Sequence, residues 1–124
     1  MGILQFNIGT MQWNVLSFEN NSSYDGTLKY MGVCFVSDKN KIYLTGGCFT
    51  NNAYPSSYVF ELQLRSLGKP FKKKNMLLKR YGHATIYMNG LIYCIGGFTH
   101  KDLPNEIPVT LSSCEKFSIS DNSW

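Results

Sequence analysis

The sequence contains few of the side chains from which metal centres and catalytic sites are usually built. Only two histidines occur in 124 residues, and the eight carboxylates are scattered along the chain. The four cysteines, Cys34, Cys48, Cys94 and Cys114, include no close pair and no zinc-type spacing. No Ser/His/Asp set, phosphate-binding glycine loop or catalytic pair of carboxylates can be recognised. We therefore expect no catalytic residues, no metal site and no cofactor.

Long apolar segments are also lacking. No stretch approaches the roughly 20 apolar residues that span a membrane. Residues 1–13 do not combine a basic start with the apolar core of a secretory signal. Four cysteines without a paired pattern fit a reducing compartment, where disulfides are rare. We therefore expect a cytoplasmic protein with no membrane partner.

Apolar and polar residues alternate over several short segments, whereas the periodicity of an amphipathic helix is sustained nowhere. Turns rich in glycine, asparagine and serine separate these segments. The clearest hairpin is predicted around Asn89-Gly90, since this dipeptide suits the two positive φ angles of a tight turn. Further strands are expected at residues 2–8, 13–18, 30–37, 41–45, 58–64, 71–78 and 113–119. The sequence therefore predicts an all-β domain.

The hairpin segment occurs twice in the chain, fifty positions apart. The aligned pairs are Leu28-Lys29 with Leu78-Lys79, Gly32 with Gly82, Ile42-Tyr43 with Ile92-Tyr93, and Gly46-Gly47 with Gly96-Gly97. A second repeat has a longer interval. Phe6, Ile8 and Trp13 recur 111 positions later, with the same spacing, as Phe117, Ile119 and Trp124. A period near fifty built from strands and glycine pairs is typical of a repeat array or propeller.

These segments resemble the Kelch repeat, in which a strand, a turn and a second strand ending in aromatic-x-x-Gly-Gly are followed by a third strand and a tryptophan near the fourth. The matching positions are Tyr43, Gly46, Gly47, Tyr93, Gly96 and Gly97, the tryptophans Trp13 and Trp124, and Arg80, Gly82 and His83 at the start of the first strand. The resemblance implies structural roles for all of them. The first copy departs from the pattern, with Tyr30 and Val33 where Arg80 and His83 stand.

The resemblance also implies a fold: an all-β, Kelch-type β-propeller, here partial, with about two blades of antiparallel four-stranded sheets. Residues 1–18 would be the last two strands of a preceding blade, residues 28–78 a complete repeat, and residues 79–124 a second repeat lacking its final strand. A closed ring typically takes about four to eight four-stranded blades. The chain would therefore be a fragment, which we favour, one of several copies that complete a ring, or an open stack. Unpaired blade faces would allow self-association.

A protein-interaction module is the function that the resemblance implies, with another protein bound through loops on one face and a role as adaptor or scaffold. Those loops would be residues 19–29, 48–57, 77–81 and 99–111. The candidate contact residues are Tyr24, Asn51, Asn52, Tyr54 and His100. Polar loops with scattered aromatic residues suit adaptable binding.

Two alternatives remain open. An enzyme on a Kelch-like propeller, galactose oxidase-like or sialic acid-processing, would need metal ligands or paired acids, to which His100, Glu61 and Glu115 offer only scattered candidates. Nucleic acid could be contacted by a cluster of basic residues with aromatic neighbours, but a solvated outer strand and turn is the simpler explanation. The cluster consists of Lys69, Lys72, Lys73, Lys74, Lys79 and Arg80, with Phe71 and Tyr81. We therefore predict a non-enzymatic module whose partner is a protein rather than a nucleic acid.

Overall fold

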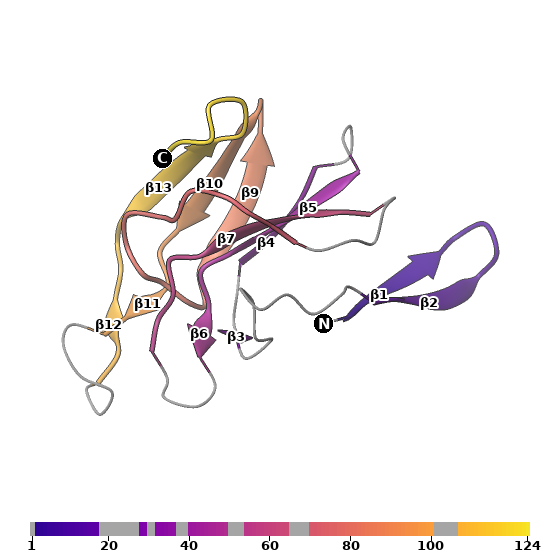
Figure 1. Ribbon diagram of the computed structural model, residues 1–124. Helices are drawn as coiled ribbons and strands as arrows, with labels where there is room; N and C mark the ends of the chain where they lie inside the picture. Colours follow the sequence, from indigo (N-terminus) through magenta and orange to yellow (C-terminus); the bar gives the residue numbers. More distant parts are fainter. Residues whose placement is uncertain are drawn as a thin grey trace.

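The chain forms strands and turns throughout its described part, as the computed structural model shows (Figure 1). The structure describes residues 2–17, 28–29, 32–36, 40–49, 54–64, 70–100 and 107–124. Thirteen strands in these residues form five antiparallel sheets, and no helix occurs among them. The predicted all-β class is therefore confirmed.

The first sheet has four strands, in the order β4 (Gly32–Val36), β5 (Lys41–Thr45), β7 (Val59–Gln63) and β8 (Phe71–Lys72). Neighbouring strands in this order, β4 with β5, β5 with β7 and β7 with β8, all pair antiparallel. Successive side chains of a strand point to opposite faces, and the residues of β7 from Val59 to Leu62 are all buried. β7 is therefore covered on both faces, and so is the other inner strand, β5, whose last four residues are also buried.

The second sheet repeats the first three strands of that order. β9 (Ala84–Met88) and β10 (Leu91–Ile95) form a hairpin, and β13 (Cys114–Ser118) pairs with the other side of β10. The turn between β9 and β10 uses Asn89 and Gly90, with φ angles of 51° and 81°, so the predicted hairpin is confirmed. β13 is an edge strand of the second sheet, whereas β7 has β8 beside it.

The fourth strand of the first sheet is shorter than the sequence predicts. A strand is expected over residues 71–78, but only the two residues of β8 pair with β7. The N–H of Lys73 still donates to the carbonyl of Val59 at 2.9 Å, whereas that of Met76 donates to Ser57 at 2.8 Å. Met76 is only 4% exposed because its side chain enters the core between the two sheets. Burial of this side chain explains why the segment leaves the sheet early.

Two small ribbons lie together at one end of the large sheets (Figure 1). Their paired strands are β3 (Leu28–Lys29) with β6 (Cys48–Phe49), and β11 (Phe98–Thr99) with β12 (Val109–Thr110). The sequence assigns most of these residues to loops, and the ribbons correct that prediction. A strand of two residues contains only one period of alternation, so no sequence pattern can indicate it.

The main core lies between the two large sheets. Tyr43 and Val59 come from the first sheet, and Ile92, Cys94 and Phe117 come from the second. Each of these side chains is at most 1% exposed. Burial of a large apolar side chain contributes roughly 1.5–3 kcal/mol to stability. This shared core therefore holds the two sheets together face to face.

A separate hairpin precedes the sheets. Its strands, β1 (Gly2–Asn7) and β2 (Gln12–Ser17), pair only with each other in the described part of the chain. The ring of Trp13 packs on Phe6 with centroids 5.0 Å apart, yet Trp13 remains 67% exposed. Figure 1 shows the hairpin standing apart from the two large sheets. Within residues 6–15, whose side chains are described, none belongs to the core that joins those sheets.

Candidate functional site

Two glycines lie where the first sheet contacts the segment that leads into the second. We call this contact, between residues 46–47 and residues 80–83, the seam. Gly46 and Gly47 follow β5 with φ angles of 63° and 104°, which only glycine adopts readily. The N–H of Gly47 donates to the carbonyl of Arg80 at 2.8 Å. A Cβ on Gly46 would overlap the same carbonyl oxygen and lie 2.8 Å from the ring of His83. The two segments can therefore approach this closely only because glycine is present.

Arg80 anchors the seam to the second sheet. The side chain is fully buried, and its guanidinium donates to the carbonyls of Gly96 (2.9 Å) and Ser113 (3.2 Å). It also forms an ion pair with Glu115 of β13 at 2.6 Å. The carboxylate of Glu115 accepts two further hydrogen bonds, at 2.7 and 3.0 Å, from the backbone N–H groups of residues 77–78. A buried pair with this many hydrogen bonds fixes the connecting segment in place.

His83 lies in the seam as a neutral, buried ring. Its Nε2 is 2.8 Å from the hydroxyl oxygen of Thr45, which also lies 3.3 Å from the hydroxyl oxygen of Thr85. Burial, with a smaller effect from Arg80, lowers the pKa of His83 to about 4. The thiol of Cys94 donates to Thr45 at 3.6 Å, and burial raises the pKa of Cys94 to about 11. Neither group is charged at neutral pH, so the cluster is suited to packing rather than to nucleophilic chemistry.

Glu61 forms the second buried charge cluster, on β7. Its carboxylate accepts a hydrogen bond from the hydroxyl of Tyr43 at 2.8 Å and forms ion pairs with Lys41 at 2.5 Å and Lys73 at 2.8 Å. Burial by itself would raise the pKa of Glu61, but the hydrogen bonds from the two lysines and Tyr43 outweigh it and lower the pKa to about 2. Lys73 is therefore the partner of a buried carboxylate, whereas Lys72 and Lys74 on either side of it are exposed, as the interpretation of the basic run as solvated predicts.

An aromatic patch, defined as Tyr81, Phe98 and His100, lies beside the seam at the ribbon end of the molecule. Tyr81 and Phe98 exchange two backbone hydrogen bonds, of 3.0 and 2.9 Å, and their ring centroids are 5.8 Å apart. His100 stacks on Tyr81 at 5.9 Å and 20°, with its Nε2 3.3 Å from the tyrosine hydroxyl. Phe98 is 42% exposed. The patch thus presents aromatic surface to solvent from a backbone held by the seam.

The residues predicted to contact a partner are only partly described. His100 belongs to the aromatic patch, and Tyr54 is 37% exposed in the segment after β6, where its carbonyl accepts a hydrogen bond from the N–H of Phe49 at 2.9 Å. The other three predicted residues, Tyr24, Asn51 and Asn52, lie outside the described residues. Neither Tyr81 nor Phe98 was among the residues predicted to contact a partner protein. Their positions in the sequence could have indicated them, since Tyr81 ends the predicted loop 77–81 and Phe98 directly follows a glycine pair.

The remaining motif positions lie at the second sheet. Gly96 and Gly97 repeat the positive φ angles of the first glycine pair, at 64° and 89°. A Cβ on Gly97 would lie 2.7 Å from the carbonyl oxygen of Tyr81, whereas a Cβ on Gly96 would meet only Leu111, at 3.4 Å. Gly82 is exposed, with a φ of 61°. Gly46 and Gly97 are therefore closely covered by backbone atoms of the segment around Arg80 and Tyr81, whereas Gly96 is not.

The repeated aromatic residues differ in burial. Tyr43 is fully buried between the sheets, whereas Tyr93 is half-buried on the outer face of the second sheet. Trp124 packs on Phe117 with ring centroids 5.2 Å apart, and its Nε1 donates to the carbonyl of Lys74 at 2.8 Å. Trp124 therefore links the second sheet to the segment that follows β8.

Within the described ranges, no group of three or more His, Cys, Asp or Glu side chains is arranged to hold a metal ion. The described part of the chain also has no helix long and apolar enough to cross a membrane.

Comparison with known proteins places this geometry in a family. Residues 79–124 match the Kelch motif. A Kelch repeat-containing protein of Dictyostelium discoideum is 30% identical over 126 residues, which cover 98% of this chain and 17% of that protein. Kelch-like protein 25 of Rattus norvegicus is 29% identical over 87 residues, covering 68% of this chain and 14% of that protein. The chain therefore spans less than a fifth of the length of these relatives.

Sequence, structure and relatives agree on the repeat. The matched residues 79–124 contain the second glycine pair, the second sheet and Trp124. All described strands pair antiparallel, as a partial all-β propeller requires. The chain belongs to the Kelch repeat family.

Proposed function

We propose that this chain is a protein–protein interaction module that binds its partner through the ribbon end, where the aromatic patch lies. Kelch repeats are generally protein-interaction modules, and the relatives are Kelch repeat and Kelch-like proteins. The observation that carries the proposal is the stacked set of Tyr81, Phe98 and His100 beside the buried seam. The finer roles of adaptor or scaffold, and a cytoplasmic location, are parts of the same proposal.

Two physical properties of the patch support this role. Aromatic side chains with a polar group supply large contact area at low conformational cost, and they are enriched at binding hot spots. The backbone beneath the patch is held by the Gly47–Arg80 hydrogen bond and by the bonds between Tyr81 and Phe98. A rigid scaffold that presents exposed loop residues reduces the entropy lost on binding.

The repeat boundaries are a further part of the proposal. We assign residues 1–18 to the last two strands of a preceding blade, residues 28–78 to a complete repeat and residues 79–124 to a repeat lacking its final strand. The two-stranded hairpin, the four-stranded first sheet and the three-stranded second sheet support this division. Self-association would use the outer face of the second sheet, where Ile86, Met88 and Ile95 are 55%, 53% and 48% exposed. Light scattering at increasing protein concentration tests that association.

Site-specific crosslinking tests the binding face. A photoreactive phenylalanine analogue replaces Phe98 in one variant and Ser120, on the exposed turn after β13, in a control variant. We expect a discrete crosslinked protein with the first variant and none with the second. The crosslink should also disappear when His100→Ala is added, because the partner loses part of its contact surface. Equal crosslinking from both positions would contradict the proposal.

A further inference from the structure

Three asparagines of the described residues adopt the left-handed backbone conformation in turns. They are Asn40, Asn89 and Asn122, with φ angles of 48°, 51° and 49°. The residues that follow them are Lys41, Gly90 and Ser123, and Asn89 is the one asparagine of the whole chain followed by glycine. An asparagine side chain can react with the backbone nitrogen of the next residue, and any side chain on that residue hinders the approach. The same reaction can therefore be compared at three similar backbone positions.

The turn at Asn89 leaves both reacting groups unengaged. The side chain of Asn89 is exposed, and no hydrogen bond of the described residues involves it. The N–H of Gly90 likewise donates to no acceptor within the described part of the chain. A Cβ added to Gly90 would meet no atom within 4 Å, so open space surrounds this backbone. Figure 1 shows the turn between β9 and β10 at the opposite end of the second sheet from the two ribbons.

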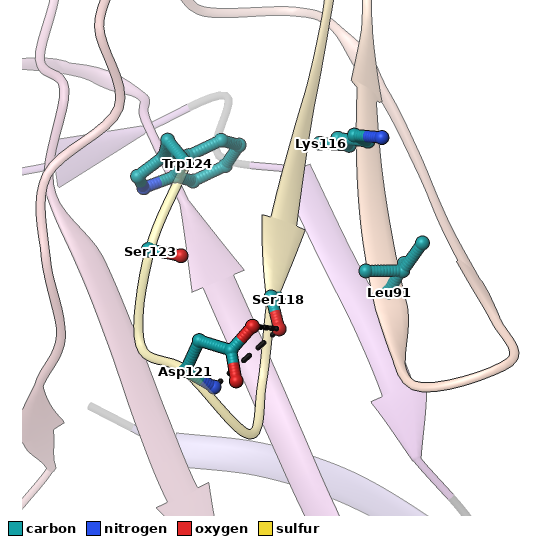
Figure 2. Close-up of a pocket in the computed structure, with 6 residues that line it drawn as sticks. All are labelled: Leu91, Lys116, Ser118, Asp121, Ser123 and Trp124. Carbon is teal, nitrogen blue, oxygen red and sulfur yellow. Dashed lines mark hydrogen bonds between the residues drawn. The ribbon is translucent and has the colours of Figure 1, made fainter.

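The turn at Asn122 is closed by hydrogen bonds. Asn122 is also exposed, but its side-chain oxygen accepts a hydrogen bond from the N–H of Lys74 at 3.2 Å. The N–H of Ser123 donates to the carbonyl of Ser118 at 3.4 Å. In the same turn Asp121 accepts a hydrogen bond of 2.9 Å from the hydroxyl of Ser118 (Figure 2). Both the amide of Asn122 and the nitrogen that would attack it are therefore held by other groups.

The turn at Asn89 is linked to the end of β13. The carbonyl of Gly90 accepts a hydrogen bond of 3.2 Å from the N–H of Ile119, which packs against the core between the two large sheets. Leu91, directly after the turn, lines a cavity of about 290 Å³ that Trp124 also borders (Figure 2). This cavity leaves room for the turn to rearrange. A change in the turn would reach β13 through the hydrogen bond between Ile119 and Gly90.

We infer that Asn89 is a site of spontaneous covalent modification, at which its side-chain amide is converted to a carboxylate. The backbone nitrogen of Gly90 bonds to Cγ of Asn89 while the Cγ–Nδ2 bond breaks, and ammonia leaves with the amide proton of Gly90. The intermediate is a five-membered succinimide. Water then opens this ring at either carbonyl, which gives aspartate or isoaspartate at position 89. Either product adds one negative charge and lowers the formal net charge from +4 to +3.

The two products should affect the fold differently. Aspartate tolerates the positive φ of this position, and an Asp-Gly pair forms the same tight turn. Isoaspartate routes the main chain through the former side chain and so adds one carbon to the backbone of a two-residue turn. Because turn length fixes the register of β9 with β10, isoaspartate should loosen this hairpin and the hydrogen bond between Ile119 and Gly90.

Incubation of the purified chain at mildly alkaline pH tests the inference, because base removes the amide proton of Gly90. Peptide mass spectrometry after chromatographic separation measures aspartate and isoaspartate at each position. We expect Asn89 to react at least about tenfold faster than Asn40 or Asn122, because it alone precedes glycine. In the isolated isoaspartate product, the amide of Ile119 should exchange at least about threefold faster than in the unmodified protein.

Two variants complete the experiment. Asn89→Gly has no amide to lose but keeps a pair that suits the turn, so isoelectric focusing should show its charge unchanged after the same incubation. Asn89→Asp should match the aspartate product, with Ile119 exchanging as in the unmodified protein. Equal rates at the three asparagines, or unchanged exchange of Ile119 in the isoaspartate product, would overturn the inference. So would an unreacted Asn89 under conditions that convert a peptide of residues 84–95.

Discussion

The two large sheets share one repeat but differ in how much of each is buried. The first sheet has a buried cluster on each face, since Ile42, Leu44, Phe60 and Leu62 form a second cluster opposite the shared core. Among the described residues the second sheet has a buried cluster on one face, and its outer face exposes apolar residues of β9 and β10. Equivalent residues therefore have different energetic roles. Their neighbours, rather than the repeat itself, decide those roles.

The largest expected difference concerns the repeated tyrosines. Tyr43→Ala should lower the free energy of unfolding by about 3–5 kcal/mol, because it opens a cavity in the shared core and removes a hydrogen bond to Glu61. Tyr93→Ala should lower it by less than about 1 kcal/mol, because Tyr93 lies half-exposed on the open face. Urea denaturation of both variants measures the difference. Equal losses would show that the two sheets are equally covered in solution.

A comparable contrast is expected for the glycine pairs. Gly46→Ala should cost about 3 kcal/mol, since it combines an unfavourable positive φ with overlap of the Arg80 carbonyl. Gly96→Ala should cost about 1 kcal/mol, because its φ is similar but its nearest contact, Leu111, lies at 3.4 Å. Thermal and urea unfolding give both values. If another segment covered Gly96 as the Arg80 carbonyl covers Gly46, Gly96→Ala would lower stability as much as Gly46→Ala does.

Acid should weaken the seam through His83. Its pKa is lowered from 6.5 to about 4 in the folded chain, so the unfolded chain binds more protons between these values. The contribution of His83 to the free energy of unfolding should therefore be present in full well above pH 6.5. It should fall by about 2 kcal/mol by pH 5 and by about 3 kcal/mol as the pH approaches 4. Glu61, with its pKa lowered from 4.5 to about 2, contributes a further loss only below pH 4.5. Urea unfolding between pH 7 and 5 isolates the histidine.

The control for this pH dependence is His83→Gln, which keeps a polar side chain but cannot titrate. The variant should be less stable than the wild type at pH 7, because it loses the fitted hydrogen bond to Thr45. Its stability should change little between pH 7 and 5. A wild-type slope that persists unchanged in the variant would assign the pH dependence to another group.

The smallest effect on stability is expected at the aromatic patch. Phe98→Ser should change the free energy of unfolding by about 0.5–1 kcal/mol, since the side chain is 42% exposed. Partner binding should nevertheless weaken by at least about tenfold, because aromatic residues at hot spots contribute more than 1 kcal/mol. Calorimetric titration with the crosslinked partner, once identified, measures the loss. Unchanged affinity with normal folding would place the binding surface elsewhere.

Local patterns predicted a large part of this fold. The Asn89-Gly90 dipeptide located the central hairpin, and alternation located β5, β7 and β13 to within one residue at each end. These signals are local, because a tight turn and a pleated strand each depend on a few consecutive residues. The ribbons and the early end of β8 escaped prediction. Both depend on contacts between distant segments, such as the burial of Met76 between the two sheets.

The candidate site was predicted less completely than the fold. Sequence reasoning named His100, but Tyr81 and Phe98 join it only through backbone pairing across a gap of seventeen residues. The Lys73–Glu61 pair was missed for a similar reason, since charge patterns along the chain do not show which strands become neighbours. Distant pairing of this kind is set by tertiary structure, and one sequence contains no direct record of it.

The longer strands and the repeat class were thus settled by local sequence, because alternation, turn dipeptides and glycine pairs act over a few residues. Tertiary structure decided which copy of each repeated residue became buried. Tyr43 and Tyr93 hold the same position in the repeat, after an isoleucine and three residues before a glycine pair, yet one lies between two sheets and the other faces outward. The cause is the contact of one sheet with another, which removes water from one tyrosine and leaves the other partly hydrated.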